Sequence, residues 1–251
     1  MNKMLGAVRN KTSDPTPIYY KLQQELKQLI ESGQWAPGDH IPPSRKIAET
    51  YGVSMGTVLK AISNLVNEKY LYSIQGKGTF VATTNIKQES LRYIRLRRDF
   101  RGDDLGFKIK LINFKVMSGF QPVSRFLKSR VTENLYTLKR VFITSIGPIV
   151  YNTSYLPCKM FKDFEDLARS RFERETLYQS IEQAYGLPTL YNHELIGVTL
   201  ADKEIAEVLG LELGQPVLTI EMLSFTYKDQ PYEYRISYCL TDNRKLYREI
   251  T

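Results

Sequence analysis

The stretch that decides the fold runs from Asp39 to Val81 and reads DHIPPSRKIAETYGVSMGTVLKAISNLVNEKYLYSIQGKGTFV. Ser44 follows two prolines and is expected to cap a short helix by accepting hydrogen bonds from its first free amides. Gly52 is expected to end that helix, because glycine tolerates the left-handed conformation of a helix terminus. Ser54 then caps a longer helix. A short helix, a turn containing glycine and a longer helix predict a helix-turn-helix.

The apolar spacing in the longer helix supports this prediction. Its expected buried side repeats at helical intervals and consists of Val58, Ala61, Ile62 and Leu65. The opposite side carries short, polar or basic residues, namely Gly56, Thr57, Lys60, Ser63 and Asn64. A thin polar face suits a helix that enters a DNA major groove about 12 Å wide.

A hairpin follows the two helices. Residues 70–74 and 79–81 read as strands, and the turn between them is Gln75-Gly76-Lys77-Gly78. Two glycines around a lysine bring exposed backbone and one positive charge to the tip. The combination predicts a winged helix.

Composition limits the alternatives. The chain has 251 residues, of which 42% are hydrophobic, which is enough for two folded domains of modest size. No apolar run approaches the roughly 18 residues of a membrane span, and the first residues lack the core of a signal peptide, so a cytoplasmic protein is expected. Two cysteines and two histidines occur without metal-ligand spacing. No metal site, cofactor or catalytic residue is predicted.

Positive charge is concentrated in the N-terminal part. The net charge is +8, and residues 111–251 hold equal numbers of basic and acidic side chains, so the whole excess lies in residues 1–110. A polyanionic partner for the N-terminal part explains this asymmetry, with a solvated basic face as the alternative.

The remainder of the chain changes to strand-like alternation. Strands are expected at 107–117, 135–143, 149–156, 190–199, 217–227 and 232–240, and helices at 122–127, 161–167, 176–185 and 202–209. Because hairpins dominate, the sequence predicts a mainly antiparallel sheet with packed helices, an α+β domain.

Residues 17–81 resemble the GntR family of bacterial repressors. The likeness rests on Ile18-Tyr19-Tyr20, Trp35-Ala36-Pro37-Gly38-Asp39, Pro43-Ser44-Arg45, Leu65-Val66-Asn67-Glu68 and Gln75-Gly76-Lys77-Gly78-Thr79-Phe80. The resemblance implies double-stranded operator DNA as the partner, contacted by Ser44, Arg45, Ser54, Gly56, Thr57, Lys60, Gly76, Lys77 and Gly78. The family often has arginine where this chain has Met55 and Leu59, so the usual family operator is in doubt.

Residues 90–251 resemble the UTRA ligand-sensing domain of the HutC branch of that family, which shares the chorismate lyase fold. The likeness is carried by residues 138–142, Gly147-Pro148-Ile149, Thr176-Leu177-Tyr178, Gly214-Gln215-Pro216-Val217 and Pro231-Tyr232-Glu233-Tyr234. Relatives that sense phosphorylated sugars have two arginines two residues apart on a strand, a hydroxyl at a helix start and two glutamates. Here the matching positions are Arg140, Phe142, Thr176, Asn152 and Glu233, and Tyr238 is added as a further effector-binding candidate.

These observations predict a two-domain protein: a flexible N-terminus (1–14), a winged helix (15–82), a linker (83–90) and a domain for effector binding and dimerisation (91–251). The expected function is a homodimeric repressor that reads an inverted repeat and responds to a small molecule, such as a sugar, a sugar acid or another carboxylate. Two alternatives stay open at this point. One is an enzyme with lyase-like chemistry in the second domain, and the other is an architectural DNA-binding protein without a ligand.

Overall fold

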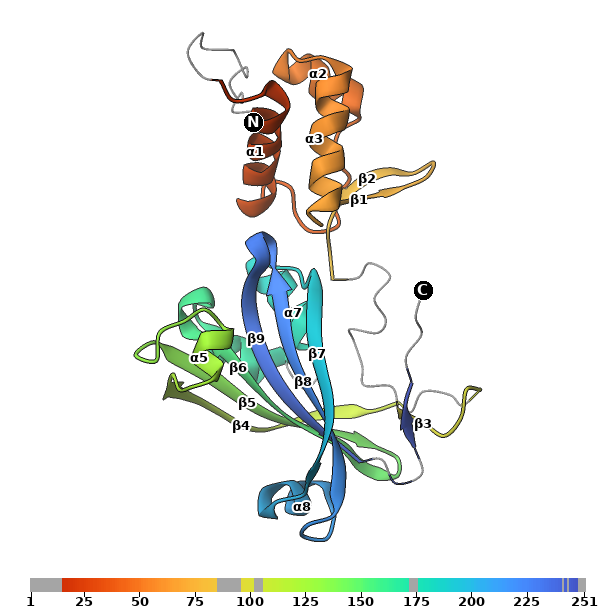
Figure 1. Cartoon of the computed structure of the whole chain (residues 1–251), viewed down its shortest axis with the longest axis vertical. Coiled ribbons are helices and arrows are strands. Elements are labelled where there is room, and N and C mark those ends of the chain that lie inside the picture. The colour runs from red at the N-terminus through yellow and green to blue at the C-terminus, as the bar shows by residue number, and fades with distance from the viewer. Residues whose placement is uncertain are drawn as a thin grey trace. The chain divides into compact units, whose positions relative to one another are not determined.

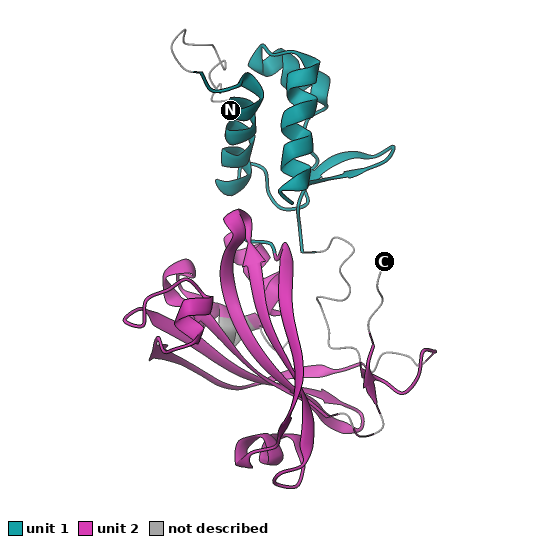
Figure 2. Ribbon diagram, viewed as in Figure 1, with its two compact units in different colours: residues 1–86, 186–188 teal, residues 87–185, 189–251 magenta. Residues whose placement is uncertain are grey.

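The computed structural model divides the chain into two compact units, residues 1–86 with 186–188 and residues 87–185 with 189–251 (Figure 2). The residues that it describes are 15–84, 96–101, 106–171, 176–240, 242 and 244–247. The predicted flexible N-terminus and most of the predicted linker lie outside them.

The first unit is a winged helix. Its helices are α1 (Ile18–Glu31), α2 (Ser44–Tyr51) and α3 (Met55–Asn67), and its hairpin pairs β1 (Leu71–Ile74) with β2 (Gly78–Val81). The predicted apolar side of α3 is buried, as are Leu22, Leu26, Leu29 and Ile30 of α1. Burial of these residues removes apolar surface from water and holds the three helices together.

The two predicted serine caps have different outcomes. Ser54 caps α3 as predicted, because its hydroxyl accepts a hydrogen bond from the Thr57 amide at 3.2 Å. The prediction for Ser44 was wrong: Pro43 occupies the N-cap position of α2, and Ser44 is the first helical residue without a side-chain cap bond. Pro43 has a φ of −53°, the value to which the proline ring restricts the chain just before the helix. Gly52 ends α2 in the left-handed conformation, with φ of 64°.

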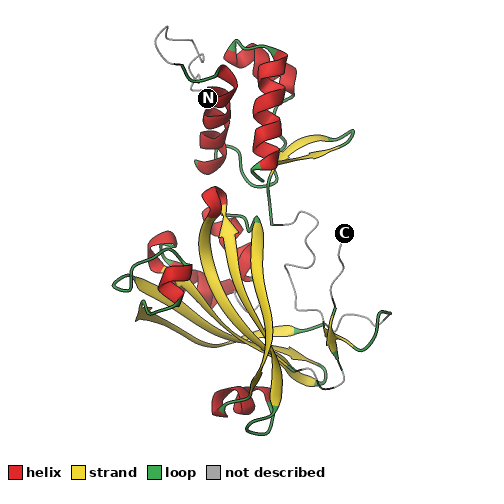
Figure 3. Ribbon diagram, in the orientation of Figure 1, coloured by secondary structure: helices red, strands yellow, loops and turns green. Residues whose placement is uncertain are grey.

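The second unit is built on a six-stranded antiparallel sheet (Figures 1 and 3). The strand order is β4-β5-β6-β9-β8-β7, so β4 and β7 are the edges. Their bounds are β4 (Lys108–Ser118), β5 (Asn134–Thr144), β6 (Gly147–Pro157), β7 (Tyr191–Leu200), β8 (Pro216–Thr226) and β9 (Gln230–Cys239). A separate short pair joins β3 (Leu96–Arg97) to β10 (Lys245–Leu246).

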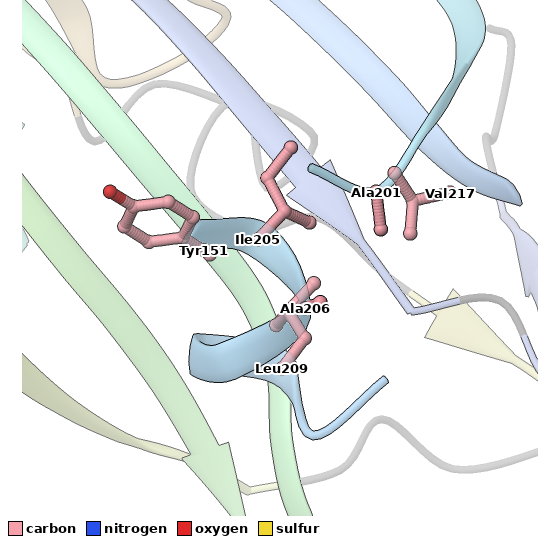
Figure 4. Packing of buried hydrophobic residues seen from close by; sticks show 6 residues of the cluster. All are labelled: Tyr151, Ala201, Ile205, Ala206, Leu209 and Val217. Atoms are coloured by element: carbon pink, nitrogen blue, oxygen red, sulfur yellow. The ribbon is translucent and has the colours of Figure 1, made fainter. Parts of the chain in front are cut away.

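Helices pack against this sheet, which confirms the predicted α+β class. They are α5 (Val123–Phe126), α6 (Phe164–Arg171), α7 (Leu177–Tyr185) and α8 (Lys203–Leu209), with short 3-10 turns at Cys158–Met160 and Tyr227–Asp229. Helix α8 packs on β6: its Ile205, Ala206 and Leu209 form a buried apolar cluster with Tyr151, Ala201 and Val217 (Figure 4).

The register assigns side chains to two faces, because directly opposed residues of an antiparallel pair lie on the same face. One row crosses β5, β6, β9 and β8 through Arg140, Asn152, Ser237 and Ile220. The neighbouring row on the same face runs through Leu138, Ser154, Arg235 and Met222. We call this the polar face. The opposite face carries Tyr151 and therefore receives α8.

Candidate functional site

The exposed side of α3 is suited to enter a groove. Gly56 and Lys60 are exposed, and so are Met55 and Leu59, with 45% and 55% of their surface accessible. The Thr57 hydroxyl lies 2.9 Å from the Ser54 hydroxyl, so the two side chains form one polar group at the start of the helix. This surface combines backbone amides, one lysine and two apolar side chains, and it can contact both phosphates and base edges.

Two further cations flank α3. Arg45, at the start of α2, is exposed and pairs with Glu49 one turn later at 3.2 Å. Such an exposed pair is weak and can exchange for a phosphate. Lys77 lies at the tip of the wing between Gly76 and Gly78, which both have positive φ. A Cβ at Gly78 would also collide with the His40 ring, so this position requires glycine.

The second unit contains a buried cluster of charged side chains on the polar face. Arg140 of β5 is only 1% exposed, and its Nη2 donates to the Ser154 hydroxyl at 3.4 Å. Ser154 in turn donates to Glu233 Oε1 at 2.6 Å. Asn152 lies directly opposite Arg140 in the ladder and is equally buried.

Glu233 is the buried carboxylate of this cluster. Its second oxygen accepts a hydrogen bond from the Ser224 hydroxyl at 3.3 Å, and Arg235 Nη1 lies 3.9 Å from its first oxygen. Burial lowers the pKa of the Arg140 guanidinium to about 10, so Arg140 remains protonated at neutral pH. Two guanidinium groups thus lie near one fully buried carboxylate, Arg235 at 3.9 Å and Arg140 through the Ser154 hydroxyl.

Family models account for both units. One described as "Bacterial regulatory proteins, gntR family" matches residues 18–81, and the UTRA domain model matches residues 105–245. The chain is a GntR-family regulator with a UTRA domain. The winged helix is thus its DNA-binding unit, and the cluster around Arg140 lies in its UTRA domain.

Individual relatives agree with this assignment. The chain is 28% identical to the HTH-type transcriptional repressor NagR of Bacillus subtilis, covering 90% of both chains. It is 26% identical to the Probable fructoselysine utilization operon transcriptional repressor of Escherichia coli, covering 88% of this chain and 90% of that one. Among solved structures, the ligand-binding domain of a GntR-family regulator from Bordetella bronchiseptica superposes with a TM-score of 0.58 at 27% identity, covering 64% of this chain and 98% of that one.

A second solved structure covers both units: YydK of Bacillus subtilis has a TM-score of 0.53 at 23% identity and covers 93% of this chain and 99% of that one, which supports the fold. These relatives are regulators of transcription and not enzymes, so the lyase alternative is set aside. The protein is a ligand-responsive DNA-binding regulator of transcription.

The UTRA domain brings some of the predicted effector residues together and separates others. Arg140, Asn152 and Glu233 lie on the polar face. Phe142 lies on the same face but packs in an apolar cluster with Leu96, Val150 and Cys239, and its ring is 5.1 Å from that of Phe107.

The other two predicted effector residues are Thr176 and Tyr238. The Thr176 hydroxyl accepts a hydrogen bond from the Gln179 amide at 3.3 Å at the start of α7. Tyr238 lies on the opposite face, where it packs beside α8 and stacks on Tyr151 at 6.0 Å. Tyr238 and Glu233 are separated by five residues on one strand, and odd spacing places them on opposite faces.

Sequence reasoning missed Ser154, Ser224 and Arg235 of the cluster. It also missed Tyr178 of α7 and Met222 of β8 beside them, whose hydroxyl and sulfur lie 3.6 Å apart. One signal was present for Arg235, because it follows Glu233 by two residues on a predicted strand and therefore shares its face. No comparable signal pointed to Tyr178 or Met222, since α7 and β8 meet only in the folded domain.

Among the described residues, no helix is long and apolar enough to cross a membrane. Within the same part of the chain, no group of three or more His, Cys, Asp or Glu side chains is placed to hold a metal ion.

Proposed function

We propose that the protein is a cytoplasmic, dimeric repressor that leaves its operator when a small molecule binds the buried cluster of the UTRA domain. The observation that carries this proposal is the pair of guanidinium groups buried with Glu233. A charged cluster of this kind is costly to fold, and buried charged groups with perturbed pKa values are concentrated at functional sites. For release to occur, the effector must bind one arrangement of the two winged helices better than the other.

A dimer on an inverted repeat is the expected DNA-bound form. One α3 helix reads too few base pairs to select a site in a genome. Two copies related by a twofold axis read two half-sites about 34–36 Å apart, which is one turn of DNA. In each copy we assign DNA contacts to three cationic side chains, those of Arg45, Lys60 and Lys77. The remaining assigned contacts come from the Ser44, Ser54 and Thr57 side chains and from the backbone of Gly56, Gly76 and Gly78.

The effector is expected to carry less negative charge than a sugar phosphate. Phe142 stands where phosphate-sensing relatives have a second arginine, and it packs among apolar side chains. Asn152 replaces a carboxylate. A sugar, a sugar acid or another carboxylate fits this set, with Glu233 accepting from hydroxyls and Arg140 binding an acid group. The relative named for a fructoselysine utilization operon supports a carbohydrate-derived effector.

The experiment combines footprinting with titration. The 251-residue chain is first footprinted on DNA around its own gene and the neighbouring genes. The protected operator is then titrated with matched sugars, sugar acids and sugar phosphates. We expect protection of an inverted repeat, release by an unphosphorylated compound and loss of that release in Arg140→Ala.

Three outcomes contradict the proposal. Protection of a single half-site by a monomer rejects the dimer. Release only by phosphorylated compounds, undiminished in Arg140→Ala, rejects both the effector class and the role of Arg140. An operator complex that no metabolite alters, together with an unchanged melting temperature, favours an architectural DNA-binding protein.

A further inference from the structure

Three hydrogen-bond donors converge on one weak acceptor in the UTRA domain. The sulfur of Met222 on β8 lies 3.6 Å from the Tyr178 hydroxyl, 3.2 Å from Arg235 Nη2 and 3.0 Å from Asn192 Nδ2. These donors come from α7, β9 and β7. A thioether sulfur accepts hydrogen bonds poorly, so three polar groups, one of them charged, are directed at a position that suits an oxygen.

The two guanidinium groups also have unused donors. Among the described residues, Nε of Arg140 and Nε of Arg235 are buried without a hydrogen-bond partner. The oxygens of Glu233 are already engaged by Ser154 and Ser224, and Arg235 Nη1 reaches the carboxylate only at 3.9 Å. Buried donors without partners are unfavourable, because the group loses its hydrogen bonds to water and gains nothing in exchange.

We propose that Arg235 supplies the second guanidinium of the effector site, and that it binds the carboxylate of a hydroxylated carboxylic acid together with Tyr178. Phe142 of β5 stands where phosphate-sensing relatives have a second arginine and carries no charge. Arg235 of β9 would supply the second cation instead. This proposal rests on the proposed role of the buried cluster as the effector site. In the complex the carboxylate would replace the Met222 sulfur as the common acceptor.

Charge balance favours a monoanion. Arg140 and Glu233 are fully buried, and the Arg235 side chain is 12% exposed, so these three groups together carry a net charge of +1. Glu194 of β7, which is also partly buried, lies next to Arg235 on this face and favours its protonated form. A carboxylate adds one negative charge to this site, whereas a phosphate dianion adds two in surroundings from which water is largely excluded.

The unpartnered acceptors specify the remainder of the ligand. Within the described part of the chain, Oδ1 of Asn152 and Oδ1 of Asn192 are buried and accept no hydrogen bond. Both lie on the polar face, one beside Arg140 and the other opposite Ser224. They would accept from hydroxyl groups of the ligand, which is why a hydroxylated acid fits better than an alkyl acid. Met222 can yield its place because its side chain is flexible.

The test measures thermal unfolding of the 251-residue chain without DNA. Three probes are compared at constant ionic strength. Glycolate has a carboxylate and a hydroxyl, methyl phosphate has a phosphate, and ethylene glycol is a neutral diol. We expect a saturable rise in melting temperature with glycolate and none with ethylene glycol. Arg235→Met and Arg140→Met should each weaken glycolate binding by about tenfold or more. Arg125→Met, which alters an exposed arginine on α5, should bind like the parent.

A second readout separates binding from a structural role. Without a probe, Arg235→Met should melt close to the parent temperature, because Arg235 Nη1 reaches Glu233 only at 3.9 Å, its Nε has no hydrogen-bond partner, and Arg140 remains to balance the carboxylate. A clear fall would identify Arg235 as a structural partner of Glu233 and overturn the proposal. If Arg235→Met does not fold, Arg235→Lys keeps the charge and loses the planar fork, and it should still lose most of the glycolate response.

Three results in the titration reject the proposal: no saturable response of the parent to glycolate, an unchanged response in the Arg235 variants, or a response to methyl phosphate alone. None of these measurements involves an operator. If no effector releases the protein from its operator, the proposed repressor mechanism is rejected, but glycolate binding at Arg235 is not. If glycolate does not bind, the role of Arg235 is rejected, but the repressor mechanism is not.

Discussion

The side-chain amide of Asn64 on α3 donates a hydrogen bond to Gln23 of α1, with a distance of 2.9 Å between Nδ2 and Oε1. Gln23 is 2% exposed and donates in turn to Glu68 at 2.7 Å. Glu68 also pairs with Lys27. This chain of polar groups fixes α1 against α3 in addition to the apolar core, and it turns Asn64 away from the DNA-facing side.

Replacing Gln23 should therefore loosen the winged helix. Gln23→Ala leaves Asn64 and Glu68 without their buried partner and should lower the free energy of local opening by about 1–3 kcal/mol. Hydrogen exchange of the α1 and α3 amides measures this quantity directly. Gln24→Ala, at an exposed position of the same helix, is the matched control. Equal exchange in the two variants would show that the polar chain contributes nothing.

Arg45→Ala and Lys77→Ala should each weaken operator binding. If each residue neutralises one phosphate, its loss reduces the salt dependence of binding by about one unit of slope. The measurement is a set of binding isotherms across a salt series. Lys203→Ala removes an exposed lysine from α8 of the UTRA domain and serves as the control. Parent-like affinity and slope in both winged-helix variants would exclude these contacts.

Met55 and Leu59 should read thymine methyl groups, because they are exposed apolar side chains on the DNA-facing side of α3. Deoxyuridine in place of thymidine removes only this methyl group. We expect one or more such replacements in the operator to weaken parent binding by about tenfold, and Leu59→Ala to lose that sensitivity at its own base pair. Ser63→Ala, also exposed on α3, should keep it. A parent protein indifferent to every replacement contradicts methyl readout.

The β7 edge should form the dimer interface. Leu195 and Val198 are each 71% exposed there, and Ile196 and Leu200 are also exposed. A long apolar edge strand is unprotected unless another chain covers it, and a second copy can pair with it around a twofold axis. In Leu195→Lys/Val198→Lys, lysines of the two copies would meet, and the dimer should weaken by about 100-fold.

Sedimentation of the variant and the parent measures this effect. Ile112→Lys places the same charge at an exposed apolar position of β4, the other edge, and should leave the dimer intact. A parent that sediments as a monomer at micromolar concentration, or a lysine variant that remains dimeric, rejects the interface.

Glu204 should make the UTRA domain sensitive to acid. Hydrogen bonds from Lys139 and Tyr151 lower the pKa of Glu204, and the Tyr151 hydroxyl lies 2.6 Å from its carboxylate. The pKa of Glu204 is lower in the folded protein than in the unfolded chain. The charged carboxylate therefore stabilises the fold at any pH above its unfolded pKa, and this stabilisation is lost as the pH falls through its folded pKa. Half of the side chain is exposed, so Glu204→Gln should cost only about 0.5–1 kcal/mol at neutral pH.

Denaturant unfolding at a series of pH values provides the check. The difference between Glu204→Gln and the parent should shrink as the parent carboxylate becomes protonated. Glu207→Gln, on the exposed side of the same helix, should show no comparable pH dependence. A difference that stays constant into strong acid would mean that the charge of Glu204 is irrelevant.

The winged helix could be read from the sequence because its determinants are local. The apolar spacing of α3 in Val58, Ala61, Ile62 and Leu65 follows helix geometry, and Gly52 and Ser54 mark the boundary between two helices within three residues. Ser44 was misassigned, because the helix begins at Ser44 itself and Pro43 occupies the N-cap position. The strand periods of the second unit were also local, and their predicted ranges lie within a few residues of β4 to β9.

The composition of the buried cluster was decided by tertiary structure alone. Arg140 and Arg235 are 95 positions apart, and they meet only because β6 pairs with β5 on one side and with β9 on the other. Met222 and Tyr178 join them from β8 and α7. The sequence by itself determined which segments form helices and strands, because those preferences depend on neighbours in the chain. It could not determine strand order, because that depends on how all the apolar surfaces are buried together, and strand order decides which charges lie side by side.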